Sequence, residues 1–115
     1  MLPSENRLRS RTEFSDVVRR GRRASRSLLT VHLLTGPDIA APVQAGLVVS
    51  KAVGGSVVRH RVARRLRHQL RPVVAGLPGG TRLVVRAAPR AADADSAALG
   101  SDLRAAVDRL VSRDR

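Results

Sequence analysis

The sequence has no cysteine, tryptophan or tyrosine, and Phe14 is its only aromatic residue. The lack of cysteine excludes disulfides, thiolate metal sites and a cysteine nucleophile. No stretch approaches the roughly 20 apolar residues that span a bilayer, and the first residues lack the apolar run of a secretion signal. We therefore expect a cytoplasmic protein without a membrane partner.

Acidic residues are also scarce. Nine Asp and Glu stand against 22 Lys and Arg, which gives a formal net charge of +13, and Lys51 is the only lysine. Such an excess repels itself unless a polyanion lies nearby, which indicates a nucleic acid or an anionic membrane. The planar guanidinium fork of arginine matches phosphate groups. We expect the partner to be structured RNA.

The sequence does not predict an active site in the protein. The nine acidic residues are scattered, so we expect no magnesium ligands and no other metal site in this chain. His60 and His68 lie more than two helical turns apart, which does not suit a histidine pair acting as general acid and base.

The length of 115 residues suits one domain over 1–115, with a single core. A capping box at Ser10, followed by apolar residues at helical spacing, predicts a short helix that ends at Gly21. Apolar runs predict strands over 28–34 and 44–50. We expect these two strands to pair antiparallel through the loop that joins them.

The central segment has the pattern of a basic helix. Four aliphatic residues from Val58 to Leu70 recur at every fourth position and form one helical stripe. At about 100° per residue, arginines project from the opposite side, and no acidic residue occurs between Arg59 and Arg71. Like charges at this spacing repel each other, so an anionic partner explains them better than a solvated charged face.

The second half predicts a strand–helix–strand unit. Pro72 and the Gly-rich segment 76–80 should end the basic helix, and 82–87 has the pattern of a strand buried on both faces. A βαβ unit follows from this order. Ser96 is the expected cap of a last helix with an apolar seam. The order is therefore αββαβα, and the fold class is α+β.

Three features each allow two interpretations. The turn of Gly54, Gly55 and Ser56 can present backbone N–H groups to a phosphate, with Ser56 as helix cap, or can simply be a turn that needs positive φ. Phe14 is either a core residue or a platform for base stacking. His32 faces either a cleft or solvent.

Residues 49–67 (VSKAVGGSVVRHRVARRLR) resemble the signature of the bacterial ribonuclease P protein subunit, and the resemblance covers the whole chain. It implies a small α/β sandwich whose βαβ crossover is left-handed, against the general right-handed rule. The sequence departs from the family pattern at four positions. His60 and Gly55 stand in place of Asn, Ala63 in place of Lys, and Val18 at a position that is often aromatic.

The resemblance also implies a function. The family's protein joins a catalytic RNA, and the complex is an endoribonuclease that removes the 5′ leader of precursor tRNA. Both RNAs are then partners, no obligate protein partner is expected, and the RNA holds Mg²⁺ and performs the hydrolysis. The resemblance implies contacts of Arg59, Arg61, Arg64, Arg65 and Arg67 with the catalytic RNA and of Phe14, His32 and Lys51 with the leader. The pattern of the basic helix adds His60, His68 and Arg71 to the contacts with the catalytic RNA, and the candidate phosphate-binding turn is Gly54, Gly55 and Ser56.

Two competing functions stay open on the residues alone. The first is a ribosomal or ribosome-associated RNA-binding protein without processing activity. The second is an autonomous metal-dependent nuclease, which ranks last because the acidic residues are scattered.

Overall fold

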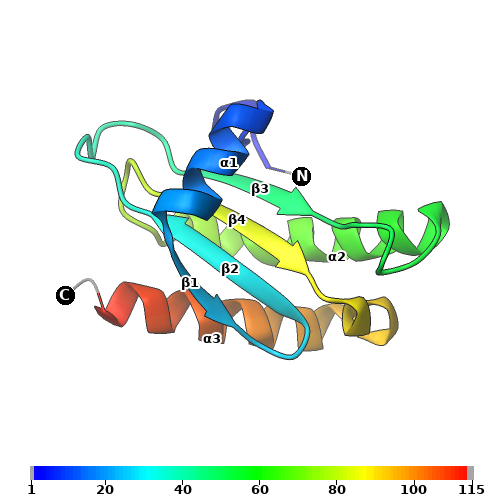
Figure 1. The fold of residues 1–115 in the computed structure, drawn as a ribbon. Coiled ribbons are helices and arrows are strands. Elements are labelled where there is room, and N and C mark those ends of the chain that lie inside the picture. Colours follow the sequence, from blue (N-terminus) through cyan, green and yellow to red (C-terminus); the bar gives the residue numbers. More distant parts are fainter. Residues whose placement is uncertain (1, 114–115) are drawn as a thin grey trace.

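The computed structural model describes residues 2–113, which form a four-stranded sheet between two layers of helices. Helix α1 lies on one face of the sheet, and α2 and α3 lie side by side on the other face (Figure 1). The elements are η1 (Ser4–Asn6), α1 (Arg11–Arg20), β1 (Arg22–Ser25), β2 (Leu29–Leu34), β3 (Gln44–Val48), α2 (Ser56–Ala75), β4 (Arg82–Ala87), η2 (Pro89–Asp93) and α3 (Ser96–Arg113).

The strand order in the sheet is β1-β2-β4-β3. Strand β2 pairs antiparallel with β1 and β4, and β3 pairs parallel with β4. The predicted antiparallel pairing of 28–34 with 44–50 is wrong, because β4 lies between these two segments. Strand β4 occupies an inner position since Leu83, Val84 and Val85 are fully buried and so require cover on both faces of the sheet.

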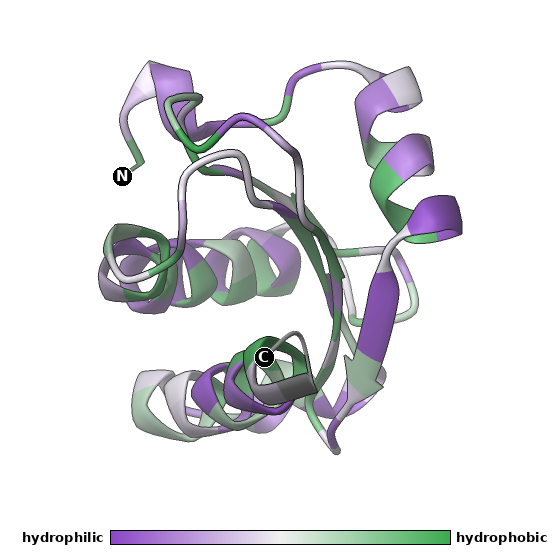
Figure 2. Ribbon diagram, turned by 90° about the vertical axis from the view of Figure 1, so that its left-hand side faces the viewer, coloured by the Kyte–Doolittle hydropathy of each residue, from purple (hydrophilic) through white to green (hydrophobic). Residues whose placement is uncertain are grey.

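The connection β3–α2–β4 forms the predicted βαβ unit, and its hand is unusual. In Figure 1 both strands run to the right, α2 lies behind them, and β4 lies below β3. Figure 2, which views the sheet from its side, places α2 on the face opposite α1. A right-handed crossover would put β4 on the other side of β3. The crossover is therefore left-handed, as the family resemblance implies.

Strand β1 is an addition to the expected αββαβα order, although the α+β fold class is confirmed. Only one residue of this four-residue strand, Ala24, is buried, so no apolar pattern reveals it. The strand forms because its backbone pairs with β2 at the edge of the sheet. In addition, the guanidinium of Arg22 donates a hydrogen bond of 2.8 Å to the carbonyl of Leu110 in α3.

Helix α1 begins and ends where the sequence predicts. The hydroxyl of Ser10 accepts a hydrogen bond from the Glu13 N–H at 3.1 Å, and the Glu13 carboxylate accepts one from the Ser10 N–H at 2.9 Å, which completes the capping box. At the other end, the Gly21 N–H donates to the carbonyl of Val17.

Helix α2 ends at Ala75, directly before the Gly-rich segment that was predicted to end it, but it differs from the prediction at its first turn and at Pro72. Gly55, and not Ser56, is the residue before the first helical turn, and Ser56 is the first helical residue. Pro72 lies inside the helix, which continues to Ala75. The helix tolerates Pro72 because this residue lies on the exposed side, where water can replace the missing backbone hydrogen bond.

The cap of α3 is Asp95 and not Ser96. The carboxylate of Asp95 accepts a hydrogen bond of 2.8 Å from the N–H of Ala98. The hydroxyl of Ser96 instead accepts a bond of 2.9 Å from the side-chain amide of Gln69, which ties the start of α3 to α2.

The core lies mainly between the sheet and helices α2 and α3. The predicted stripe of α2 is confirmed, because Val62, Leu66 and Leu70 are fully buried and Val58 packs against them. A smaller cluster on the other face attaches α1 to the sheet, and its buried members are Leu8, Val17 and Val84.

Candidate nucleic-acid interface

The outer surface of α2 carries the exposed part of the basic helix. Arg64, Arg67 and Arg71 are exposed, and within residues 2–113 their guanidinium groups form no hydrogen bond or ion pair. His60 and His68 are exposed beside them. The structure therefore gathers five of the eight predicted RNA-contacting residues of this helix on one free, cationic surface.

Arg61 and Arg65 lie on the flank of α2 that faces the β4–α3 connection. The guanidinium of Arg61 donates a hydrogen bond of 3.2 Å to the carbonyl of Ala92, and that of Arg65 donates one of 2.7 Å to the carbonyl of Ala94. Both side chains are half-buried. These two arginines thus hold the segment around η2 in place, a task that the sequence pattern does not reveal.

Arg59 lies on the opposite flank of α2, beside the outer edge of β3. It lines a shallow cavity together with Val49 and Ala63. Its Nε atom is buried and has no hydrogen-bond partner among the described residues. The structure therefore places Arg59 at this cavity but covers its Nε–H.

The turn before α2 leaves the amino end of the helix open. Gly54 has φ = 156°, and a Cβ atom on it would lie 2.9 Å from Cγ1 of Val58, so this position requires glycine. A Cβ on Gly55 would meet no atom within 4 Å. No side chain of the described residues caps the first backbone N–H groups, and they remain available to an anion.

Phe14 lies against the backbone of β3. A Cβ atom on Gly46 would be only 2.3 Å from two carbons of the Phe14 ring, so the ring occupies the space that any other residue at this position would need. The strand register continues this row across the sheet, from Gly46 to Val84, His32 and Arg23. Phe14 and His32 therefore belong to the same face of the sheet.

His32 is buried, with 4% of its surface exposed. The sequence left open whether it faces a cleft or solvent, and solvent is therefore wrong. Neither ring nitrogen has a hydrogen-bond partner among the described residues. Burial lowers the pKa of His32, and the nearby charges of Arg86 and Arg23 lower it further. The imidazole is thus neutral at pH 7. Lys51, the third predicted leader contact, is exposed in the turn after β3.

A salt-bridge network that attaches α1 to this face of the sheet was not predicted. The carboxylate of Asp16 on α1 forms ion pairs of 3.2 Å with Arg20 of the same helix and with Arg82 of β4. The hydrogen bond from Arg20 and the charge of Arg82 hold the pKa of Asp16 below its usual range. The spacing of Asp16 and Arg20 could have indicated the first pair, but the second requires knowledge of the fold.

Metal-binding clusters and membrane-spanning helices are both absent from residues 2–113. No group of three or more His, Cys, Asp or Glu side chains there could hold a metal ion. No helix in this range is both long and apolar enough to cross a membrane.

Comparison with known proteins identifies the family. The family model described as Ribonuclease P matches residues 2–111. The Ribonuclease P protein component of Streptomyces avermitilis is 58% identical over 118 residues, covering 96% of each chain, and that of Nocardioides sp. is 50% identical, covering 96% of this chain and 95% of the relative.

Solved structures agree in fold. The Staphylococcus aureus RNase P protein has a TM-score of 0.78 at 17% identity, covering 96% of this chain and 95% of that one. The Thermotoga maritima RNase P protein has a TM-score of 0.73 at 20% identity, covering 90% and 94%. The family match and the close relatives together show that the chain belongs to the ribonuclease P protein component family.

Proposed function

We propose that this protein assists ribonuclease P through two surfaces, one for the catalytic RNA and one for the 5′ leader of precursor tRNA. Membership of the family makes the chain part of an RNA-containing endoribonuclease of tRNA processing. The alternative of a ribosomal protein gains no support from its relatives. The residue assignments below are the substance of the proposal.

The outer surface of α2 is the proposed contact with the catalytic RNA. The observation that carries this assignment is the row of exposed guanidinium groups of Arg64, Arg67 and Arg71, which have no partner within residues 2–113. Each group can bind a backbone phosphate and release counterions from the RNA. The open amino end of α2, at Gly55 and Ser56, adds backbone N–H donors at the start of the same helix.

The face of the sheet beside α1 is the proposed contact with the leader. The Phe14 ring is partly exposed and fixed on the backbone at Gly46, which suits stacking of one unpaired base. His32 is buried in the same row, so it shapes the floor of this face and can accept a hydrogen bond only if a neighbouring side chain moves. Lys51 supplies a charge where β3 leaves the sheet.

In this proposal the Mg²⁺ ions belong to the RNA subunit, and the protein has no catalytic residue. Its part is to neutralise phosphate charge and to hold the substrate, both of which lower the Mg²⁺ concentration that cleavage needs. A cytoplasmic location is part of the same proposal.

The test is the binding of protein variants to a bacterial ribonuclease P RNA over a range of salt concentrations. Replacement of Arg64, Arg67 and Arg71 together by alanine should weaken binding and lower the logarithmic salt slope by about 0.9 for each phosphate that is no longer neutralised. Replacement of the exposed Arg109 of α3 by alanine is the matched control and should change little. An unaltered salt slope of the triple variant would show that the outer surface of α2 does not contact the RNA.

A further inference from the structure

The amino-terminal segment, residues 2–8, forms a strap along the outer edge of β3. Arg7 forms a parallel β-bridge with Ala45. The Leu8 N–H donates a hydrogen bond of 3.0 Å to the carbonyl of Ala45. The side-chain amide of Asn6 donates one of 2.7 Å to the carbonyl of Val43. Backbone bonds therefore fix the position of Arg7 before any ligand binds.

Apolar side chains anchor the strap at both of its ends. Leu2 is 6% exposed and belongs to the main core, whereas Leu8 is 7% exposed and belongs to the cluster under α1. The strap thus reaches from one face of the sheet to the other around β3. Nothing in the charge or hydropathy pattern of the sequence predicts this arrangement.

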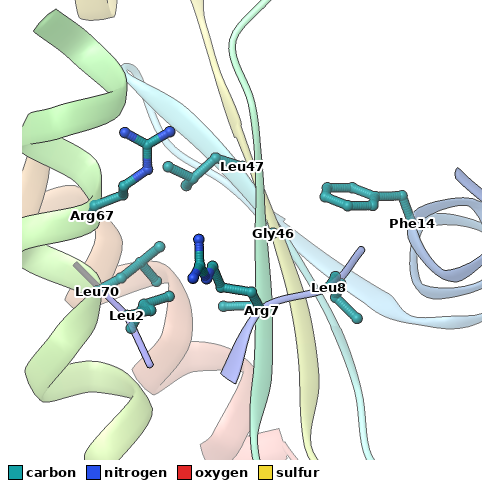
Figure 3. Close-up of a pocket in the computed structure, with 9 residues that line it drawn as sticks. Leu2, Arg7, Leu8, Phe14, Gly46, Leu47, Arg67 and Leu70 are labelled. Carbon is teal, nitrogen blue, oxygen red and sulfur yellow. The ribbon is translucent and has the colours of Figure 1, made fainter. Parts of the chain in front are cut away.

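A cavity of about 310 Å³ opens where the strap meets α2. Figure 3 shows that the side chains of Arg7 and Arg67 extend into the space between β3 and α2, beside Leu2 and Leu70. Phe14 contributes to the same cavity from the other side of the strand. The cavity therefore lies at the junction of the two proposed RNA surfaces.

The charge of this cavity is uncompensated. Within the described part of the chain, neither Arg7 nor Arg67 forms a side-chain hydrogen bond or ion pair, and no acidic residue lines the cavity. Two guanidinium groups in one cavity repel each other unless an anion lies between them. A phosphodiester group suits this position because its oxygens accept bonds from two arginine forks.

We propose that Arg7 and Arg67 together bind one phosphodiester group of an RNA backbone at the outer edge of β3. The proposal deepens the proposed function and rests on it. Arg67 belongs to the α2 surface, and Phe14, on the other side of β3, belongs to the leader surface. The strap arginine therefore makes the RNA interface continuous around the strand.

The experiment is a double-mutant cycle on RNA binding. The full-length protein and its Arg7→Ala, Arg67→Ala and double variants are titrated with a bacterial ribonuclease P RNA at several salt concentrations. Each single variant should lose about tenfold in affinity. Because one phosphate is shared, the double variant should lose much less than the product of the two, and its salt slope should fall by about one unit rather than two.

Two further variants and a comparison of two substrates make the result decisive. Arg7→Lys should recover part of the affinity, because it keeps the charge but loses the fork. Arg109→Ala removes an equal charge from exposed α3 and should change the affinity by less than about twofold. Binding of the assembled enzyme to precursor and to mature tRNA tells whether the phosphate belongs to the leader or to the catalytic RNA.

Two outcomes would overturn the shared phosphate site. One is a double variant whose loss equals the product of the single losses, which would mean separate contacts. The other is an Arg7→Ala variant that behaves like Arg109→Ala. Failure of the proposed function is seen separately, since the unaltered protein would then not bind the ribonuclease P RNA tightly or stimulate precursor cleavage.

Discussion

Replacement of Gly46 by alanine tests whether the Phe14 ring is held by the backbone of β3. The added Cβ would lie 2.3 Å from Cε2 and from Cζ of Phe14. Carbon atoms in van der Waals contact are about 3.5–4.0 Å apart, so the ring or the whole of α1 must move by more than about 1 Å. Overpacking of this kind costs about 1–3 kcal/mol of unfolding free energy.

Urea unfolding of a double-mutant cycle measures this clash. Gly46→Ala should destabilise the protein by about 1–3 kcal/mol, and the cost should vanish or reverse in a Phe14→Ala background, where the space is free. Gly76→Ala is the matched control, because its Cβ would lie 3.7 Å from the nearest atom, the carbonyl oxygen of Pro72. This control should be neutral or slightly stabilising.

The same variant has a functional consequence. If Phe14 stacks on a leader base, its displacement in Gly46→Ala should weaken binding of precursor tRNA to the assembled enzyme more than binding of mature tRNA. Phe14→Leu should act in the same direction while it keeps the fold. An equal cost of Gly46→Ala with and without the Phe14 ring would refute the packing argument, and equal losses for both tRNAs would make Phe14 a core residue only.

Two other predictions concern side chains that the fold buries wholly or in part. Replacement of Arg61 and Arg65 by alanine should each lower the unfolding free energy by about 1 kcal/mol, since their bonds to the carbonyls near η2 can no longer form; an unchanged thermal midpoint would contradict this role. The pKa of His32 is about 6.5 in the unfolded chain and lower in the folded protein. As the pH drops below about 7, the unfolded chain therefore binds a proton more readily than the folded protein, and the free energy of unfolding should fall. His32→Leu should reduce that loss between about pH 7.5 and 5.5, and identical pH slopes in both proteins would show that His32 is not its source.

Local patterns predicted the helices well, because the apolar stripe of α2 and the capping box of α1 are encoded within a few neighbouring residues. The pairing of the strands was not accessible in the same way. Strand β4 lies between two segments that are adjacent in sequence, and β1 has a single buried residue. Such arrangements depend on contacts between distant segments, which periodicity does not report.

The sequence predicted which residues make up the candidate site, but not which of them bind other parts of the chain and which stay available to RNA. The arginines of α2 all look alike in sequence, yet Arg61 and Arg65 bond to carbonyls of the chain while Arg64 stays free among the described residues. The row that joins Gly46 to His32 needs the register of three strands. Arg7 was missed because its importance comes from the strap beside β3, and a lone arginine gives no local signal.

The central claim is tested most directly by precursor tRNA cleavage at low Mg²⁺, with purified protein and a bacterial ribonuclease P RNA, each alone and mixed. The 5′ leader should be removed efficiently only in the mixture, and neither component alone should suffice. Unchanged activity of the RNA upon addition of the protein would contradict the claim, and cleavage by the protein alone would show an active site in this chain.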